Sequence, residues 1–168
     1  MNLKNIKKYT PGFNIHDIQK KYNLKEVIKL ASNENPFISK DVLSFIKKSN
    51  HKLNLYPDSN PDELHKSLAN TVGHRMTSNN IILGNGSNEI LEFIVRANVD
   101  NKSEVIIPKY SFLVYEIISK LQNAKIIITK PDNDKASENY LGINLESIKE
   151  KITNKTKLIF IANPANPT

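Results

Sequence analysis

The chain has 168 residues, of which 39% are hydrophobic and 24% charged, and this length suits one domain with a real core rather than two large ones. It contains no cysteine, which excludes disulfides, thiolate metal sites and cysteine nucleophiles and fits a reducing compartment. No apolar run approaches the roughly 20 residues that span a bilayer, and the first residues lack the apolar core of a signal peptide. We therefore expect a cytoplasmic protein with no membrane partner.

The formal net charge of +7 raises the hypothesis of a basic nucleic-acid-binding domain. Such a surface gathers lysine and arginine on one face, preferably with interleaved aromatic residues. Here most basic residues are scattered lysines, and Arg75 and Arg96 are the only arginines. The pattern favours a lysine-rich solvated surface, so we expect no nucleic-acid partner. A non-catalytic anion- or nucleic-acid-binding basic domain remains the alternative from another functional class.

The first part of the chain predicts mostly irregular structure with short helices. Residues 1–35 contain one stretch of helical spacing, at Ile15, Ile18 and Tyr22. Ser39 then opens a helix whose apolar side includes Phe45.

A stronger helix signal follows at Asn60, which can act as the cap. Pro61 suits the first helical position, and Glu63 stands three residues after the cap. The apolar stripe of this helix continues at Leu64, Leu68 and Val72.

From residue 80 the pattern alternates between short apolar strands and amphipathic helices. Strands are predicted at 81–83, 105–107, 125–129 and 158–162, and helices at 89–97, about 111–121 and 145–152. Strand–helix–strand units of this kind predict an α/β fold, a mostly parallel sheet with helices on both faces.

The first candidate site is the turn GNGSNE, Gly84–Glu89, between a predicted strand and a helix start. Glycines allow a sharp bend and a close approach to a ligand. Ser87 is a good helix cap, and the free amides of Ser87, Asn88 and Glu89 together with the helix dipole suit a phosphate. The sequence matches neither a P-loop nor GxGxxG, and an ordinary structural turn remains an equal alternative.

Two further turns follow predicted strand ends. Tyr110 and Phe112 can stack on a flat heteroaromatic ligand, although aromatic residues at a helix start are more often core. In NPANPT the prolines restrict Asn163 and Asn166, whose amides can donate to a phenolate oxygen. Because ligands of open α/β sheets bind beyond the carboxyl ends of the strands, we expect one site built from all three turns. No metal site is predicted.

The order and spacing of several motifs resemble the fold-type-I, pyridoxal-phosphate-dependent aminotransferases, most closely their histidinol-phosphate branch. The similarity extends over nearly the whole chain, including Tyr9–Gly12 near the start. The motifs are LASNENPF (30–37), LYPD (55–58), GNGSNEIL (84–91), PKYSFLVY (108–115) and ANPANPT (162–168). The fold implied is an incomplete large domain of this transferase family, at 59–168, preceded by an N-terminal arm and part of the small domain at 1–58.

The resemblance also implies roles for individual residues around pyridoxal 5'-phosphate. Its phosphate is expected at Gly86, Ser87 and Asn88, and at Tyr56 of the partner subunit in a homodimer. Its ring is expected against Phe112, with Tyr110 as the alternative. The remaining residues implied are Asn166 for the phenolic oxygen, and Asn33 and Glu34 near the substrate.

The family's Schiff-base lysine, an aspartate for the pyridine nitrogen and arginines for the substrate phosphate come after the asparagine turn. The chain stops at Thr168, inside that turn, so we expect a fragment that is inactive alone and carries no catalytic residue. The resemblance implies that the complete protein transfers an amino group between glutamate, the amino donor, and a phosphorylated keto substrate, imidazole acetol phosphate, in histidine biosynthesis. Sister enzymes remain alternatives: threonine-phosphate decarboxylase, or an aromatic or aspartate-type aminotransferase.

Overall fold

The computed structural model describes residues 6, 9, 11–49 and 53–167. The chain forms two compact units, one made of Met1–Tyr9 and Ile82–Thr168 and the other of Thr10–Ile81. The predicted boundary between residues 58 and 59 concerns the domains of the complete protein and stays a prediction. No helix in the described part of the chain is long and apolar enough to cross a membrane.

The unit Thr10–Ile81 consists of short helices and loops. Its helices are α1 (Ile15–Tyr22), α2 (Lys40–Ser49), α3 (Asp62–Val72) and a 3-10 turn, η3 (Ser78–Asn80). The helix predicted to open at Ser39 is confirmed as α2, and Ser39 Oγ accepts a hydrogen bond from the Val42 amide at 3.4 Å. Neither α1 nor α2 has a buried side chain. These helices therefore leave their apolar stripes uncovered within the described chain.

The predicted cap at Asn60 is wrong. Helix α3 begins at Asp62, with Pro61 in the cap position and no side-chain cap bond. The Asn60 amide donates to Asp58 Oδ1 at 3.0 Å, and its carbonyl accepts from the Asp62 amide at 2.8 Å. A turn closed by the Asp58 carboxylate thus delays the start of the helix.

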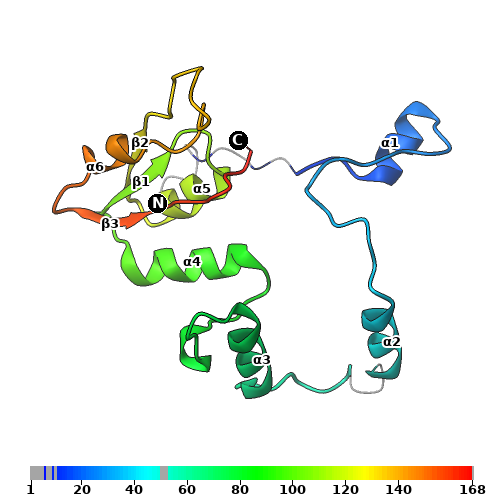
Figure 1. The fold of residues 1–168 in the computed structure, drawn as a ribbon. Coiled ribbons are helices and arrows are strands. Elements are labelled where there is room, and N and C mark those ends of the chain that lie inside the picture. Colours follow the sequence, from blue (N-terminus) through cyan, green and yellow to red (C-terminus); the bar gives the residue numbers. More distant parts are fainter. Residues whose placement is uncertain (1–5, 7–8, 10, 50–52, 168) are drawn as a thin grey trace. The chain divides into compact units, whose positions relative to one another are not determined.

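The other unit is built on a parallel sheet. Its strands β1 (Glu104–Pro108), β2 (Lys125–Thr129) and β3 (Thr156–Ile159) lie in the order β2-β1-β3, and both pairings are parallel (Figure 1). Its helices are α4 (Ser87–Asn98), α5 (Leu113–Leu121) and α6 (Leu145–Lys149). The predicted parallel α/β arrangement is confirmed.

Several element boundaries differ from the prediction. Residues 81–83 do not form a strand, because a strand needs a hydrogen-bonded neighbour and the described sheet contains only β1, β2 and β3. Helix α6 ends at Lys149, and β3 ends at Ile159 rather than at residue 162.

The core lies between the sheet and helices α4 and α5. Every residue of the central strand β1 is buried. The buried cluster is Val95, Val99, Val105, Ile107, Ile118 and Phe160. Val105 and Ile107 share one face of β1 because side chains alternate along a strand, so this face carries the two helices.

The amino ends of the strands are tied together by the nearly buried Glu104. Its carboxylate accepts hydrogen bonds from Lys125 Nζ at 2.8 Å and from Thr153 Oγ1 at 2.7 Å. These two bonds, the Lys125 bond first, lower the pKa of Glu104 below its ordinary value. One side chain thus connects β1, β2 and the turn before β3.

Candidate functional site

The turn before α4 contains two glycines that serve different purposes. Gly86 has φ 85° and ψ 166°, a region that is essentially restricted to glycine. A Cβ on Gly86 would meet nothing within 4 Å, so the space beside it is open. A Cβ on Gly84 would instead lie 2.7 Å from Ile90 Cδ1 and 2.9 Å from Glu89 Oε2. Gly84 therefore makes room for the protein's own side chains, and the open space lies at Gly86.

The first turn of α4 has backbone amides with no side-chain cap. The cap predicted at Ser87 is wrong, because Gly86 occupies the cap position and Ser87 is the first helical residue. No side chain caps the helix, and the first amides of a helix have no acceptor within it. Ser87 and Asn88 are exposed. With the positive end of the helix dipole, this arrangement suits an anion such as a phosphate.

The turn after β1 holds the two aromatic candidates in different surroundings. Tyr110 has φ 65° and is 41% exposed, and Lys109 Nζ lies 5.2 Å from its ring centroid. Phe112 is half-buried, and its ring makes edge contacts with Tyr9, at 6.2 Å between centroids, and with Tyr115, at 5.9 Å. Phe112 is thus engaged by the protein's own rings, whereas Tyr110 is the more accessible ring.

The turn after β3 carries Asn163 and Asn166, and both are exposed. Thr168, the last residue of the NPANPT motif, lies outside the described residues, as does Thr10 of the motif near the start. The adjoining Phe160 is held firmly: its amide donates to the Ile106 carbonyl at 3.0 Å, and its ring stacks on Tyr115 with centroids 4.3 Å apart.

The sheet brings two of the three turns to one edge. Strands β1 and β3 are parallel neighbours, so the turns that follow them leave at the same, carboxyl end of the sheet. Helix α4 lies alongside β3, with its first residues and the carboxyl end of β3 toward the same side (Figure 1). The arrangement agrees with one site at this edge, and the joint role of Ser87, Phe112 and Asn166 stays a prediction.

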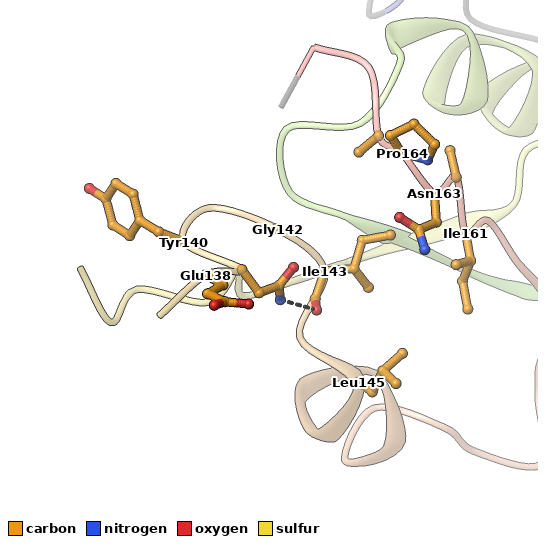
Figure 2. A pocket seen from close by; sticks show the side chains of 11 residues that line it. Glu138, Tyr140, Gly142, Ile143, Leu145, Ile161, Asn163 and Pro164 are labelled. Atoms are coloured by element: carbon orange, nitrogen blue, oxygen red, sulfur yellow. Dashed lines mark hydrogen bonds between the residues drawn. The ribbon is translucent and has the colours of Figure 1, made fainter. Parts of the chain in front are cut away.

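A pocket of about 430 Å³ opens beside the end of β3 (Figure 2). Residues of the segment 138–145 and of 161–165 line it, and Ile143 faces Ile161 and Asn163 across the opening. The pocket includes Asn163 but none of the predicted cofactor residues. This pocket is therefore not the predicted cofactor site.

The remaining predicted residues belong to the other unit. Glu34 Oε1 pairs with Lys29 Nζ at 2.5 Å, and Asn33 has a positive φ of 50°. Tyr56 is 100% exposed. Their expected proximity to substrate and cofactor stays a prediction.

Two contacts of the candidate site were not predicted from the sequence. Glu89 Oε2 accepts a hydrogen bond from the Asn85 amide at 2.7 Å, and a glutamate three residues after a helix cap is the sequence signal for such a bond. The ring stack of Tyr115 on Phe160 joins residues far apart in the chain and has no local signal.

Comparisons with known proteins agree on one family. The family model "Aminotransferase class I and II" matches residues 25–168. A Desulfotalea psychrophila protein named histidinol-phosphate aminotransferase is 38% identical over 170 residues, which is 99% of this chain and 42% of that protein. The chain thus spans less than half the length of the curated relatives that it matches.

Solved structures share the fold. The histidinol-phosphate aminotransferase of Sinorhizobium meliloti, solved in complex with pyridoxal-5'-phosphate, aligns with a TM-score of 0.78 and 20% identity, over 95% of this chain and 41% of that one. The histidinol-phosphate aminotransferase of Clostridium acetobutylicum aligns with a TM-score of 0.65 and 29% identity, over 82% of this chain and 38% of that one. The predicted fold class, part of the large α/β domain of such transferases, is confirmed. With the family model matching residues 25–168, the chain belongs to the class I and II aminotransferases.

Proposed function

We propose that the complete protein is a pyridoxal-phosphate-dependent aminotransferase that exchanges an amino group between glutamate and imidazole acetol phosphate. This is the histidinol-phosphate transaminase reaction of histidine biosynthesis, and we place it in the cytoplasm. The observation that carries the proposal is the 38% identity, over 99% of the chain, to a protein named for this activity.

The first turn of α4 fits the cofactor's phosphate. The backbone of Gly86 leaves open space, and the exposed Ser87 and Asn88 offer amides without acceptors in the helix. Hydrogen bonds from amides to a charged phosphate are stronger than those to a neutral group. Ser87 and Asn88 would therefore hold the phosphate, and Gly86 would leave room for it.

The cofactor ring would lie at the turns after β1 and β3. The structure favours Tyr110 over Phe112 as the stacking residue, because Phe112 already packs edge-on against Tyr9 and Tyr115. The Asn166 amide would donate to the phenolic oxygen and stabilise its charged form. When bound, pyridoxal phosphate supplies the electron sink for the carbanion formed at the substrate.

The contribution of this part of the chain is then orientation and electrostatic tuning. Amides at the start of α4 would hold the phosphate, an aromatic side chain would stack on the ring, and Asn166 would donate to the phenolic oxygen. Asn33 and Glu34 would contact the substrate. Residues that hold the reacting groups in the correct relative orientation can lower the activation free energy substantially, because the entropy cost of that orientation is met on binding.

The proposed assembly is a homodimer in which Tyr56 of the partner subunit reaches the cofactor phosphate. The complete exposure of Tyr56 in one chain supports this proposal, as does the exposure of its neighbours Leu53 and Leu55. An aromatic side chain that is fully exposed next to apolar residues gains most by burial against a second copy.

The test uses the complete protein, loaded with pyridoxal phosphate, and four amino donors in turn. We expect histidinol phosphate with 2-oxoglutarate to turn over at least about tenfold faster than aspartate, phenylalanine or threonine phosphate. Carbon dioxide release from threonine phosphate, or preference for a donor without phosphate, would instead identify a sister enzyme. A protein that does not bind the cofactor would refute the whole proposal.

A further inference from the structure

Glu89 bonds to the backbone that leads into the phosphate turn. Its Oε2 accepts a hydrogen bond from the Asn85 amide at 2.7 Å, and the same oxygen lies 2.9 Å from the place of a Cβ on Gly84. The Gly86 amide donates to the Gly84 carbonyl at 2.9 Å. The turn is therefore closed by one short backbone bond and one carboxylate, and a side chain on Gly84 would obstruct that carboxylate.

The charge of Glu89 makes this arrangement informative. A carboxylate in the first turn of a helix stabilises the helix, but it also repels an anion bound at the same end. A residue present only for its charge would thus work against phosphate binding. Glu89 Oε2 accepts the hydrogen bond of the Asn85 amide, so that this amide has a partner within the protein. The bond also holds the backbone that leads into Gly86 and Ser87 in place.

We infer that Glu89 is a positioning residue that shapes the phosphate cradle at the start of α4 through its bond to the Asn85 amide, an inference that rests on the proposed cofactor function. The hydrogen bond, and not the negative charge, is what the cradle requires. Glutamine keeps the acceptor oxygen without the charge, whereas alanine removes both.

The test compares Glu89→Gln and Glu89→Ala in the complete protein, with pyridoxal phosphate and pyridoxal as probes. We expect Glu89→Gln to bind pyridoxal phosphate at least as tightly as the unsubstituted protein, and Glu89→Ala to bind it about tenfold more weakly. Binding of pyridoxal, which lacks the phosphate, should change little in either variant. Equal losses in both variants would show that the charge matters, and an equal loss for both probes would show a general loss of structure; either result overturns the inference.

Glu92 provides the matched control on the same helix. Its Oε1 pairs with Arg96 at 2.6 Å, away from the turn. Glu92→Ala should leave the affinity for pyridoxal phosphate unchanged; a loss like that of Glu89→Ala would overturn the inference.

Amide hydrogen exchange over residues 84–89 separates this inference from the proposed function. Exchange should be faster in Glu89→Ala than in Glu89→Gln even without cofactor. If the unsubstituted protein does not bind pyridoxal phosphate, the proposed function fails, and equal exchange in the two variants would then overturn the role of Glu89 independently.

Discussion

Replacing Gly86 with alanine should separate backbone strain from crowding in the turn before α4. Gly86 has φ 85° and ψ 166°, and a Cβ there would meet no atom within 4 Å, so the effect of alanine is purely conformational. Holding an alanine in this region costs about 1–3 kcal/mol. Alanine also restricts the unfolded chain, which offsets about 0.4–1 kcal/mol. The net loss should be about 1–2 kcal/mol, and a turn that relaxes to avoid it would misalign the amides of Ser87 and Asn88.

The crowded glycine should respond differently. Gly84→Ala places a Cβ 2.7 Å from Ile90 Cδ1, so its cost comes from overpacking, about 1–3 kcal/mol. Shortening the neighbour by Ile90→Val removes that methyl group and should recover part of the loss. The same Ile90→Val change should not rescue Gly86→Ala, because no side chain crowds that position.

Gly73 is the matched control for strain alone. It has φ 70°, a Cβ there would also meet nothing within 4 Å, and it belongs to the other compact unit, at the end of α3. Urea unfolding and pyridoxal phosphate titration of the complete protein measure both effects. Gly73→Ala should lower stability and leave cofactor affinity unchanged, whereas Gly86→Ala should lower both. Equal affinities in Gly86→Ala and the unsubstituted protein would refute the reasoning.

Three further predictions concern stability and activity. Bonds from Lys125 and Thr153 lower the pKa of Glu104 below 4.5, so its stabilising contribution is present above that pH and is lost as the pH falls through the lowered pKa. Glu104→Gln should therefore flatten the loss of stability in acid, as measured by urea unfolding between neutral pH and about pH 3. Phe160→Ala removes a buried, stacked ring and should lower the free energy of unfolding by about 3–5 kcal/mol, measured by the same method. Residues 1–168 alone should show no transaminase turnover in a product assay, because the resemblance places the lysine later in the family's sequence.

The alternating part of the fold was predictable because each element carries its own local signal. The strand at Lys125–Thr129 is confirmed at both ends, and β1 extends the predicted 105–107 by one residue on each side. Boundaries that depend on partners were less predictable. Residues 81–83 have the apolar pattern of a strand, yet no neighbour in the described sheet bonds to them.

The ends of the helices illustrate what local patterns leave open. Ser87 and Asn60 are both good cap residues by type, and neither caps a helix. At α4 the cap position is occupied by Gly86, whose backbone conformation is one that glycine alone readily adopts. Before α3, the Asp58 carboxylate closes a turn by accepting a hydrogen bond from the Asn60 amide. In both cases a competing local bond or conformation decides the boundary, and residue preference alone does not express that competition.

The different surroundings of Tyr110 and Phe112 depend on contacts from distant residues. Both rings follow β1, and the sequence alone cannot tell a core ring from a ligand platform. In the structure their surroundings differ because Tyr9, far away in the chain, lies against Phe112, while the stacking role itself stays a prediction.

The two ends of the central strand β1 have different roles: the Glu104 network lies at its amino end, and the predicted ligand site lies at its carboxyl end. It is buried along its whole length, so all of its side chains belong to the interior of this unit. Its amino end is fixed through Glu104, and its carboxyl end leads into the turn of Tyr110. Parallel strands place all their carboxyl ends at one edge, so a ligand site at that edge lies a strand's length from the Glu104 network. It follows that Glu104→Gln should change the response to acid without changing cofactor affinity. A variant of Glu104 that weakened cofactor binding at neutral pH while leaving stability intact would contradict this separation.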